Sequence, residues 1–216
     1  MSDPVALELR EQFATPEQQR ETASAGMWIF LMTEVLMFGA LFSAYTVYRV
    51  IHPQGFALGS SEMDIVLGSI NTAILLTTSL IMAFAEFNAQ EGNERWLAIC
   101  LVAVMLLGAV FLYIKFSEYI EHYHEHKAPG FWFEDNSPYA NNVQLFFVFY
   151  FIMTGLHAVH MIIGIGIMAF LLFRTWVGSF SAQYHTPVVI GGLYWHFVDI
   201  IWIFLYAIFY LPGLHR

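Results

Sequence analysis

The feature that most constrains the fold is a long apolar run at residues 143–173, which contains no Lys, Arg, Asp or Glu. An uncharged apolar run longer than about 18 residues predicts a transmembrane helix, because about 20 residues cross the hydrocarbon core of a bilayer. Besides Tyr150, its titratable side chains are His157 and His160, which lie three residues apart and therefore share one helix face. We expect that face to point towards protein. Three small residues in the run allow neighbouring helices to approach closely: Gly155, Gly164 and Gly166.

The composition agrees with a membrane protein. Hydrophobic residues make up 58% of the chain and charged residues 12%, against about 25% charged residues in an ordinary soluble domain. The formal net charge of −9 argues against nucleic-acid binding. The single cysteine, Cys100, lies inside an apolar run, which excludes a disulfide framework and a cysteine-rich metal site.

Five apolar segments are long enough to span a membrane, and lipid forces each of them to be helical because it cannot satisfy open backbone groups. The predicted fold is therefore an all-α bundle of five transmembrane helices, formed by residues 26–216. Residues 1–25 are an acidic, soluble N-terminal tail that lacks the pattern of a secretory signal. The predicted spans are residues 27–48, 65–85, 96–114 (extended to about 127), 143–173 and 188–211.

Five ionisable side chains within these spans are candidates for function: Glu34, His157, His160, His196 and Asp199. A charge near the bilayer centre costs at least ~2.5–3.5 kcal/mol, so such groups are rarely incidental. Counted from the N-terminal side, they lie at similar depths, which predicts one polar cluster joining the first, fourth and fifth spans. The cluster could fix helix packing, conduct or buffer protons, or bind a metal or haem. The last interpretation is the weakest, because histidines at i and i+3 on one helix cannot both flank a single haem.

A second candidate lies at the hydrophilic end of the third span. His122 and His126 are one helical turn apart and could hold a divalent metal. The alternative is a solvated acidic helix end that contacts a partner.

Five motifs occur in a fixed order along the chain: M-W-I-F-L-M-T-E-V-L-M-F, N-T-A-I-L-L-T-T-S, S-E-Y-I-E, T-G-L-H-A-V-H-M-I-I-G and Y-W-H-F-V-D-I-I-W-I-F-L-Y. Together they resemble subunit III of the haem-copper respiratory oxidases, the cytochrome c oxidase subunit III family. The resemblance covers residues 27–211, and the fourth and fifth motifs are its most specific parts.

This resemblance implies a non-catalytic subunit that holds neither haem nor copper and packs against subunit I, which carries the oxygen-reducing centre. The complex is an oxidoreductase that reduces oxygen to water in aerobic respiration. Subunit III protects sustained turnover and supports proton uptake. The basic residues do not decide the orientation of the chain in the membrane, because four lie on each side. The resemblance places the N-terminus on the cytoplasmic side of a bacterial-type cell membrane and the C-terminus on the opposite side.

The resemblance also assigns roles to individual residues. Glu34 resembles the family's buried, carbodiimide-reactive carboxylate, and the other four candidates match inward polar positions: His157, His160, His196 and Asp199. Arg174 and His185 resemble positions that hold the phosphate of a bound phospholipid, which a cation would pair with.

The chain departs from the usual seven-helix form, which has two further helices where this sequence has its acidic tail. Two close alternatives are accessory subunits of a quinol oxidase or of a nitric oxide reductase. A free-standing proton-coupled transporter would favour inverted repeats and broken helices, and the sequence shows neither. A membrane cytochrome would need histidines opposed on two helices at equal depth.

Overall fold

The computed structural model describes residues 13–215 except 131, 132, 134, 136, 179 and 181–183. Five of its helices are long and apolar enough to cross a membrane, which confirms the predicted all-α fold with five transmembrane helices. They are α1 (Pro16–Ile51), α3 (Ile65–Gln90), α4 (Glu94–His124), α5 (Ala140–Trp176) and α6 (Thr186–Phe209). Two shorter elements complete the described chain: α2 (Pro53–Ser61) and the 3-10 helix η1 (Leu211–His215).

Local sequence signals explain where the long helices begin. The hydroxyl of Thr15 accepts a hydrogen bond from the amide of Gln18, and Pro16 occupies the first helical position, where its missing N–H costs nothing. Helix α1 therefore begins before the predicted apolar segment and includes residues 16–25 of the acidic tail. Asp64 caps α3 by accepting from the amides of Val66 and Leu67 at 2.8 and 3.1 Å.

The helix ends follow equally local rules. Gly92, with φ of 72°, lies in the short turn between α3 and α4, and Gly178, with φ of 69°, follows α5. Glycine adopts this left-handed conformation without the steric cost that other residues bear, and it commonly ends helices for that reason. Helix α4 ends at His124, close to the predicted extension to about residue 127.

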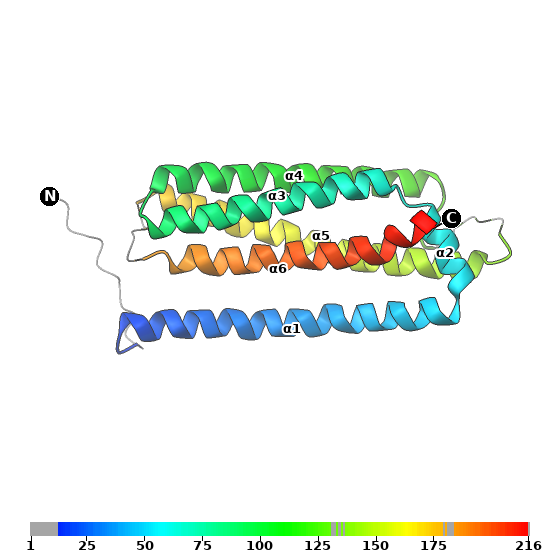
Figure 1. Cartoon of the computed structure of the whole chain (residues 1–216), viewed down its shortest axis with the longest axis horizontal. Helices are drawn as coiled ribbons and strands as arrows, with labels where there is room; N and C mark the ends of the chain where they lie inside the picture. The colour runs from blue at the N-terminus through cyan, green and yellow to red at the C-terminus, as the bar shows by residue number, and fades with distance from the viewer. Residues whose placement is uncertain are drawn as a thin grey trace.

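Helix α1 lies along one side of the other four long helices, as Figure 1 shows. Its buried side chains, Leu31, Phe38 and Tyr45, are seven residues apart and form one narrow stripe. At one end of this stripe, the hydroxyl of Tyr45 donates to the carbonyl of Ile208 in α6 at 2.8 Å. Most of the remaining surface of α1 is apolar and exposed, which leaves it for lipid or for another protein chain.

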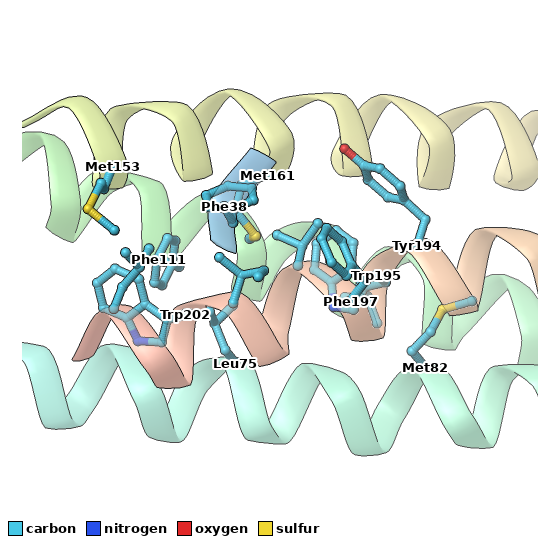
Figure 2. Close-up of a cluster of buried hydrophobic side chains, with 14 of the residues drawn as sticks. Phe38, Leu75, Met82, Phe111, Met153, Met161, Tyr194, Trp195, Phe197 and Trp202 are labelled. Atoms are coloured by element: carbon cyan, nitrogen blue, oxygen red, sulfur yellow. The ribbon is translucent and has the colours of Figure 1, made fainter. Parts of the chain in front are cut away.

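Large aromatic side chains fill the space between α3, α4, α5 and α6 (Figure 2). Trp195 of α6 lies against Gly108 of α4 and Gly164 of α5, where an added Cβ would come within 3.0 and 3.2 Å of the indole ring. Its indole N–H donates to the hydroxyl of Thr78 in α3 at 3.2 Å. One tryptophan therefore ties four helices together. The other two glycines predicted to allow close packing do not pack tightly: a Cβ at Gly155 would come no closer than 3.9 Å to the Tyr119 hydroxyl, and Gly166 has open space around it.

Candidate functional site

The structure brings Glu34 of α1 and His160 of α5 together. The carboxylate oxygen Oε2 of Glu34 lies 3.1 Å from Nε2 of His160, and the two side chains are 15% and 10% exposed. The other ring nitrogen of His160, Nδ1, lies 2.8 Å from the carbonyl oxygen of Leu156 in the preceding helical turn. This Glu34–His160 pair joins α1 to the rest of the bundle.

The hydrogen bonds of His160 determine how many protons the pair holds. A carbonyl oxygen can only accept, so Nδ1 must carry a proton. The contact between Nε2 and the Glu34 carboxyl group then requires one further proton. Either a neutral imidazole accepts it from a carboxylic acid, or an imidazolium donates it to a carboxylate. Both arrangements are neutral overall, so the pair can move one proton between two atoms 3.1 Å apart without changing its net charge.

Aromatic groups cover the pair. The ring of Phe38 meets the His160 ring edge-on, with centroids 5.5 Å apart. The hydroxyl of Tyr194 in α6 donates to the carbonyl of His160 at 3.0 Å, and Phe30 stacks on the Tyr194 ring at 6.2 Å. Hydrogen bonds and charges act more strongly in such weakly polar surroundings than in water.

His157 lies one turn before His160 on α5 but faces the interior of the bundle. Its ring packs edge-on against Phe111 of α4 at 5.6 Å and lies 5.3 Å from Trp202 of α6. Neither ring nitrogen has a hydrogen-bond partner among the described residues, although the residue is 1% exposed. His157 is therefore separate from the Glu34–His160 pair.

His196 and Asp199 of α6 face α3. Nδ1 of His196 lies 2.8 Å from the hydroxyl oxygen of Ser79, and its Nε2 lies 3.7 Å from Oε1 of Glu86. The structure thus divides the single polar cluster predicted from the sequence into two sites, one at α1 and α5 and one at α3 and α6, and leaves His157 outside both. A spacing of three residues on α6 places both side chains on one face, but it does not say which neighbouring helix that face meets.

A third polar cluster was not predicted from the sequence. The ammonium group of Lys115 donates to Oε2 of Glu118 at 2.9 Å and to the hydroxyls of Tyr150 and Tyr210 at 2.7 and 2.5 Å. Both tyrosine hydroxyls donate in turn to Oε1 of Glu118, at 2.8 and 2.7 Å. All four residues are at most 2% exposed. The network is closed and locks α4, α5 and α6 together.

A signal for this cluster was present in the sequence. Lys115 and Glu118 are three residues apart, which places opposite charges on the same face of α4 next to an apolar run. The sequence alone favours an exposed Lys115, because charges at the end of a span usually reach water. Only the position of two tyrosines from other helices shows that the pair is buried.

The two histidines at the end of α4 do not form a pair. His122 is 5% exposed and packs against Phe147 and Tyr150, whereas His126 lies beyond the helix with φ of 58°. In the part of the chain that the structure describes, no three His, Cys, Asp or Glu side chains come together in a way that could hold a metal ion.

A groove of about 520 Å³ lies between the start of α1, the end of α5 and the start of α6. Its lining is mostly apolar and includes Phe170, Arg20 and Tyr184. The two residues predicted to bind a phospholipid lie at the same end of the bundle. Arg174 is in the last turn of α5, with its guanidinium 6.0 Å from the ring centre of Phe180, and His185 immediately precedes α6.

Comparison with known proteins identifies the family. The family described as "Cytochrome c oxidase subunit III" matches residues 15–214. Cytochrome c oxidase subunit 3 of Thermostichus vulcanus is 32% identical, with 86% of this chain and 85% of the relative covered. The cytochrome bo(3) ubiquinol oxidase subunit 3 of Pseudomonas aeruginosa is 30% identical (87% and 84% covered), and the quinol oxidase subunit 3 of Bacillus subtilis is 29% identical (93% and 94% covered).

The match to the family covers all five long helices and therefore both polar sites and the Lys115 cluster. It confirms the resemblance found in the five sequence motifs. The chain belongs to the cytochrome c oxidase subunit III family of the haem-copper oxidases.

Proposed function

We propose that this chain is a non-catalytic subunit of a haem-copper terminal oxidase that reduces oxygen to water, and that it binds subunit I and holds protons for it. The observation that carries this proposal is the Glu34–His160 pair, a neutral acid–base couple buried where α1 meets α5. The haem and copper belong to subunit I in this proposal, and this chain supplies protein surface and protons.

The geometry of the pair suits a proton relay, in which one partner takes up a proton while the other releases one. A proton that moves between Oε2 of Glu34 and Nε2 of His160 crosses a single hydrogen bond of 3.1 Å. The pair stays neutral, so the move avoids the cost of creating a net charge in a weakly polar environment. Glu34 keeps 15% of its side chain exposed on the outside of the bundle, where a neighbouring subunit that covers α1 would contact it.

The relatives support a terminal oxidase with either of two electron donors. Their names include a cytochrome c oxidase and two quinol oxidases, at 29–32% identity. We assign this chain to a cytochrome c oxidase, in keeping with the family that matches it, and a quinol oxidase is the second candidate.

We also propose that the groove near the start of α1 holds the acyl chain of a phospholipid. Its apolar lining suits a hydrocarbon chain, and Arg174 and His185 at the same end of the bundle suit the phosphate group. This end lies at the cytoplasmic surface of the cell membrane if the N-terminus is inside, as the family resemblance implies.

The decisive experiment is extraction of the tagged chain in mild detergent, followed by identification of the chains and haems that accompany it. We expect a haem-copper subunit I to co-purify. In the same complex, Glu34→Ala should leave the initial turnover per haem within about twofold of wild type, because the chemistry takes place in another chain. Glu91→Ala, an exposed acid at the end of α3, is the matched control.

Two results would refute the proposal. One is a chain that purifies alone, stable and enzymatically active, without a copper-bearing companion. The other is immediate loss of haem signal and activity when Glu34 is replaced in a correctly assembled complex.

A further inference from the structure

A second line of proton-carrying groups runs between α3 and α6 and is separate from the Glu34–His160 pair. We call it the α3–α6 polar line, and it consists of Glu86 and Ser79 from α3 and His196 and Asp199 from α6. Glu86 lies four residues before the end of α3, and its side chain is 22% exposed. Asp199 lies thirteen residues into α6 and is 3% exposed. The line therefore leads from the end of the bundle towards its middle.

Gly192 provides the space in which the Glu86 carboxyl group lies. A Cβ added at position 192 would overlap Oε1 of Glu86, so this carboxyl group occupies the volume that any other side chain at 192 would fill. Gly192 is one turn before His196 on the same face of α6, and Glu86 is two turns after Ser79 on the same face of α3. The backbone of α6 thus holds the Glu86 carboxyl group next to the His196 ring.

The polar line has two places that require water. The 3.7 Å between Oε1 of Glu86 and Nε2 of His196 is too long for a direct hydrogen bond. A bridging water satisfies both groups at such a separation. Farther in, Asp199 faces Ser79, but neither carboxyl oxygen has a hydrogen-bond partner of good geometry among the described residues. A buried carboxyl group without partners is costly, and ordered internal water is the usual remedy.

The hydrogen bond between Ser79 and His196 gives the line a direction. For the Ser79 hydroxyl to donate towards Asp199, its oxygen must accept from His196, which requires the proton of a neutral ring to be on Nδ1. Nε2 then carries the lone pair and faces Glu86. In this arrangement His196 donates to Ser79, and the hydroxyl proton of Ser79 can point inward, to a water between Ser79 and Asp199.

We propose that the α3–α6 polar line binds internal water and carries protons from Glu86 to Asp199. In one transfer, protonated Glu86 gives its proton through the bridging water to Nε2 of His196, and Nδ1 releases its proton to the oxygen of Ser79. Ser79 releases its own proton through the second water to the carboxylate of Asp199. One proton leaves Glu86 and one arrives at Asp199, and the imidazole ends as the other neutral tautomer.

Four charged or titratable side chains of the described interior, on α4 and α5, have contacts outside this line. On α4, Lys115 and Glu118 bind each other and two tyrosines. On α5, His160 binds Glu34, and His157 packs against Trp202, one turn beyond Asp199 on α6. This proposal adds a second proton site to the proposed function. The proton transfer along the α3–α6 polar line involves only residues of this chain.

Infrared difference spectroscopy of the purified complex after a rapid downward pH step tests the proposal. Protonation of Asp199 should produce a carboxylic acid C=O band that shifts when aspartate is labelled with carbon-13 at its carboxyl group. The band should be absent in Asp199→Asn. In Glu86→Gln the band should reach its full height, but at least tenfold more slowly than in wild type.

A pair of glycine variants separates this effect from general damage. Gly192→Ala should slow the appearance of the Asp199 band as Glu86→Gln does, because the new methyl group displaces the Glu86 carboxyl group. Gly166→Ala is the control, since an added Cβ there has open space. The proposal is overturned if no aspartate band appears in wild type, or if it rises at the wild-type rate in both Glu86→Gln and Gly192→Ala. Either result could occur in a complex with a normal subunit composition and turnover, so failure here is distinguishable from failure of the proposed function.

Discussion

Replacing Lys115 by methionine should be among the most damaging single changes to the stability of this chain. All three ammonium protons of Lys115 are used, by Glu118, Tyr150 and Tyr210 at 2.9, 2.7 and 2.5 Å. Methionine fills a similar volume, so the change removes the charge and the three hydrogen bonds while creating little cavity. It leaves the carboxylate of Glu118, which is 2% exposed, without a counter-charge.

The magnitude follows from the burial of both partners. Breaking a buried ion pair by removing one partner costs about 3–5 kcal/mol, because an uncompensated charge remains. Glu118→Gln should cost a similar amount, since it leaves the ammonium group buried without its partner. In the double variant Lys115→Met/Glu118→Gln, no charge remains and the amide oxygen still accepts from both tyrosines. We expect a total loss of only about 1.5–3 kcal/mol, the contribution of one charged hydrogen bond.

The assay is unfolding in mixed micelles by titration with sodium dodecyl sulfate, followed by tryptophan fluorescence. The control is Lys127→Met, because Lys127 forms an equally short ion pair with Glu62 (2.9 Å) at the surface, with side chains 17% and 33% exposed. Exposed pairs contribute about 0–1 kcal/mol, so this variant should unfold almost as wild type does. The reasoning is refuted if the two buried single variants each lose less than 1 kcal/mol, or if their losses simply add in the double variant.

Three further predictions use the same unfolding assay or the turnover of the complex. Asp64→Ala removes the cap of α3 and should lower the free energy of unfolding by about 1 kcal/mol. Gly164→Leu should cost more than 3 kcal/mol, because the new side chain would overlap the ring of Trp195, whereas Gly166→Leu should change stability by less than about 0.5 kcal/mol. Glu34→Gln should preserve assembly and initial turnover but shorten the time for which the oxidase sustains its rate, which a long oxygen-consumption trace would detect; an unchanged trace would contradict the proposed proton role.

Much of this architecture could be predicted because membranes impose simple rules. Lipid forces apolar segments such as residues 143–173 and 188–211 to be helical, and the first lies within α5 while α6 covers the second as far as residue 209. The helix α2 could not be predicted in this way. It is too short and too polar to give a periodic signal, and it is held by contacts such as that of the Ser60 hydroxyl with the carbonyl of Phe209.

The sequence predicted which residues form the candidate site, but not which residues contact one another. Glu34 and His160 were singled out because a charge inside a membrane is costly, and the structure joins them. Nothing in the sequence singles out Glu86, which follows the uncharged core of its span, where a carboxyl group usually reaches water. Its role depends on the absence of a side chain at Gly192, more than a hundred residues away in the sequence, and no local pattern reports such a contact.

The sequence by itself determined that this chain crosses a membrane with five helices, and which polar side chains those helices carry into it. It could do so because hydrophobicity and helical periodicity act over short stretches of chain. Only the tertiary structure decided that Glu34 contacts His160 and that His196 faces Ser79 and Glu86. It also decided that Lys115 is buried between two tyrosines. Those contacts depend on the rotation of each helix about its own axis, and that rotation is set by the packing of large side chains such as Trp195 against glycines on other helices.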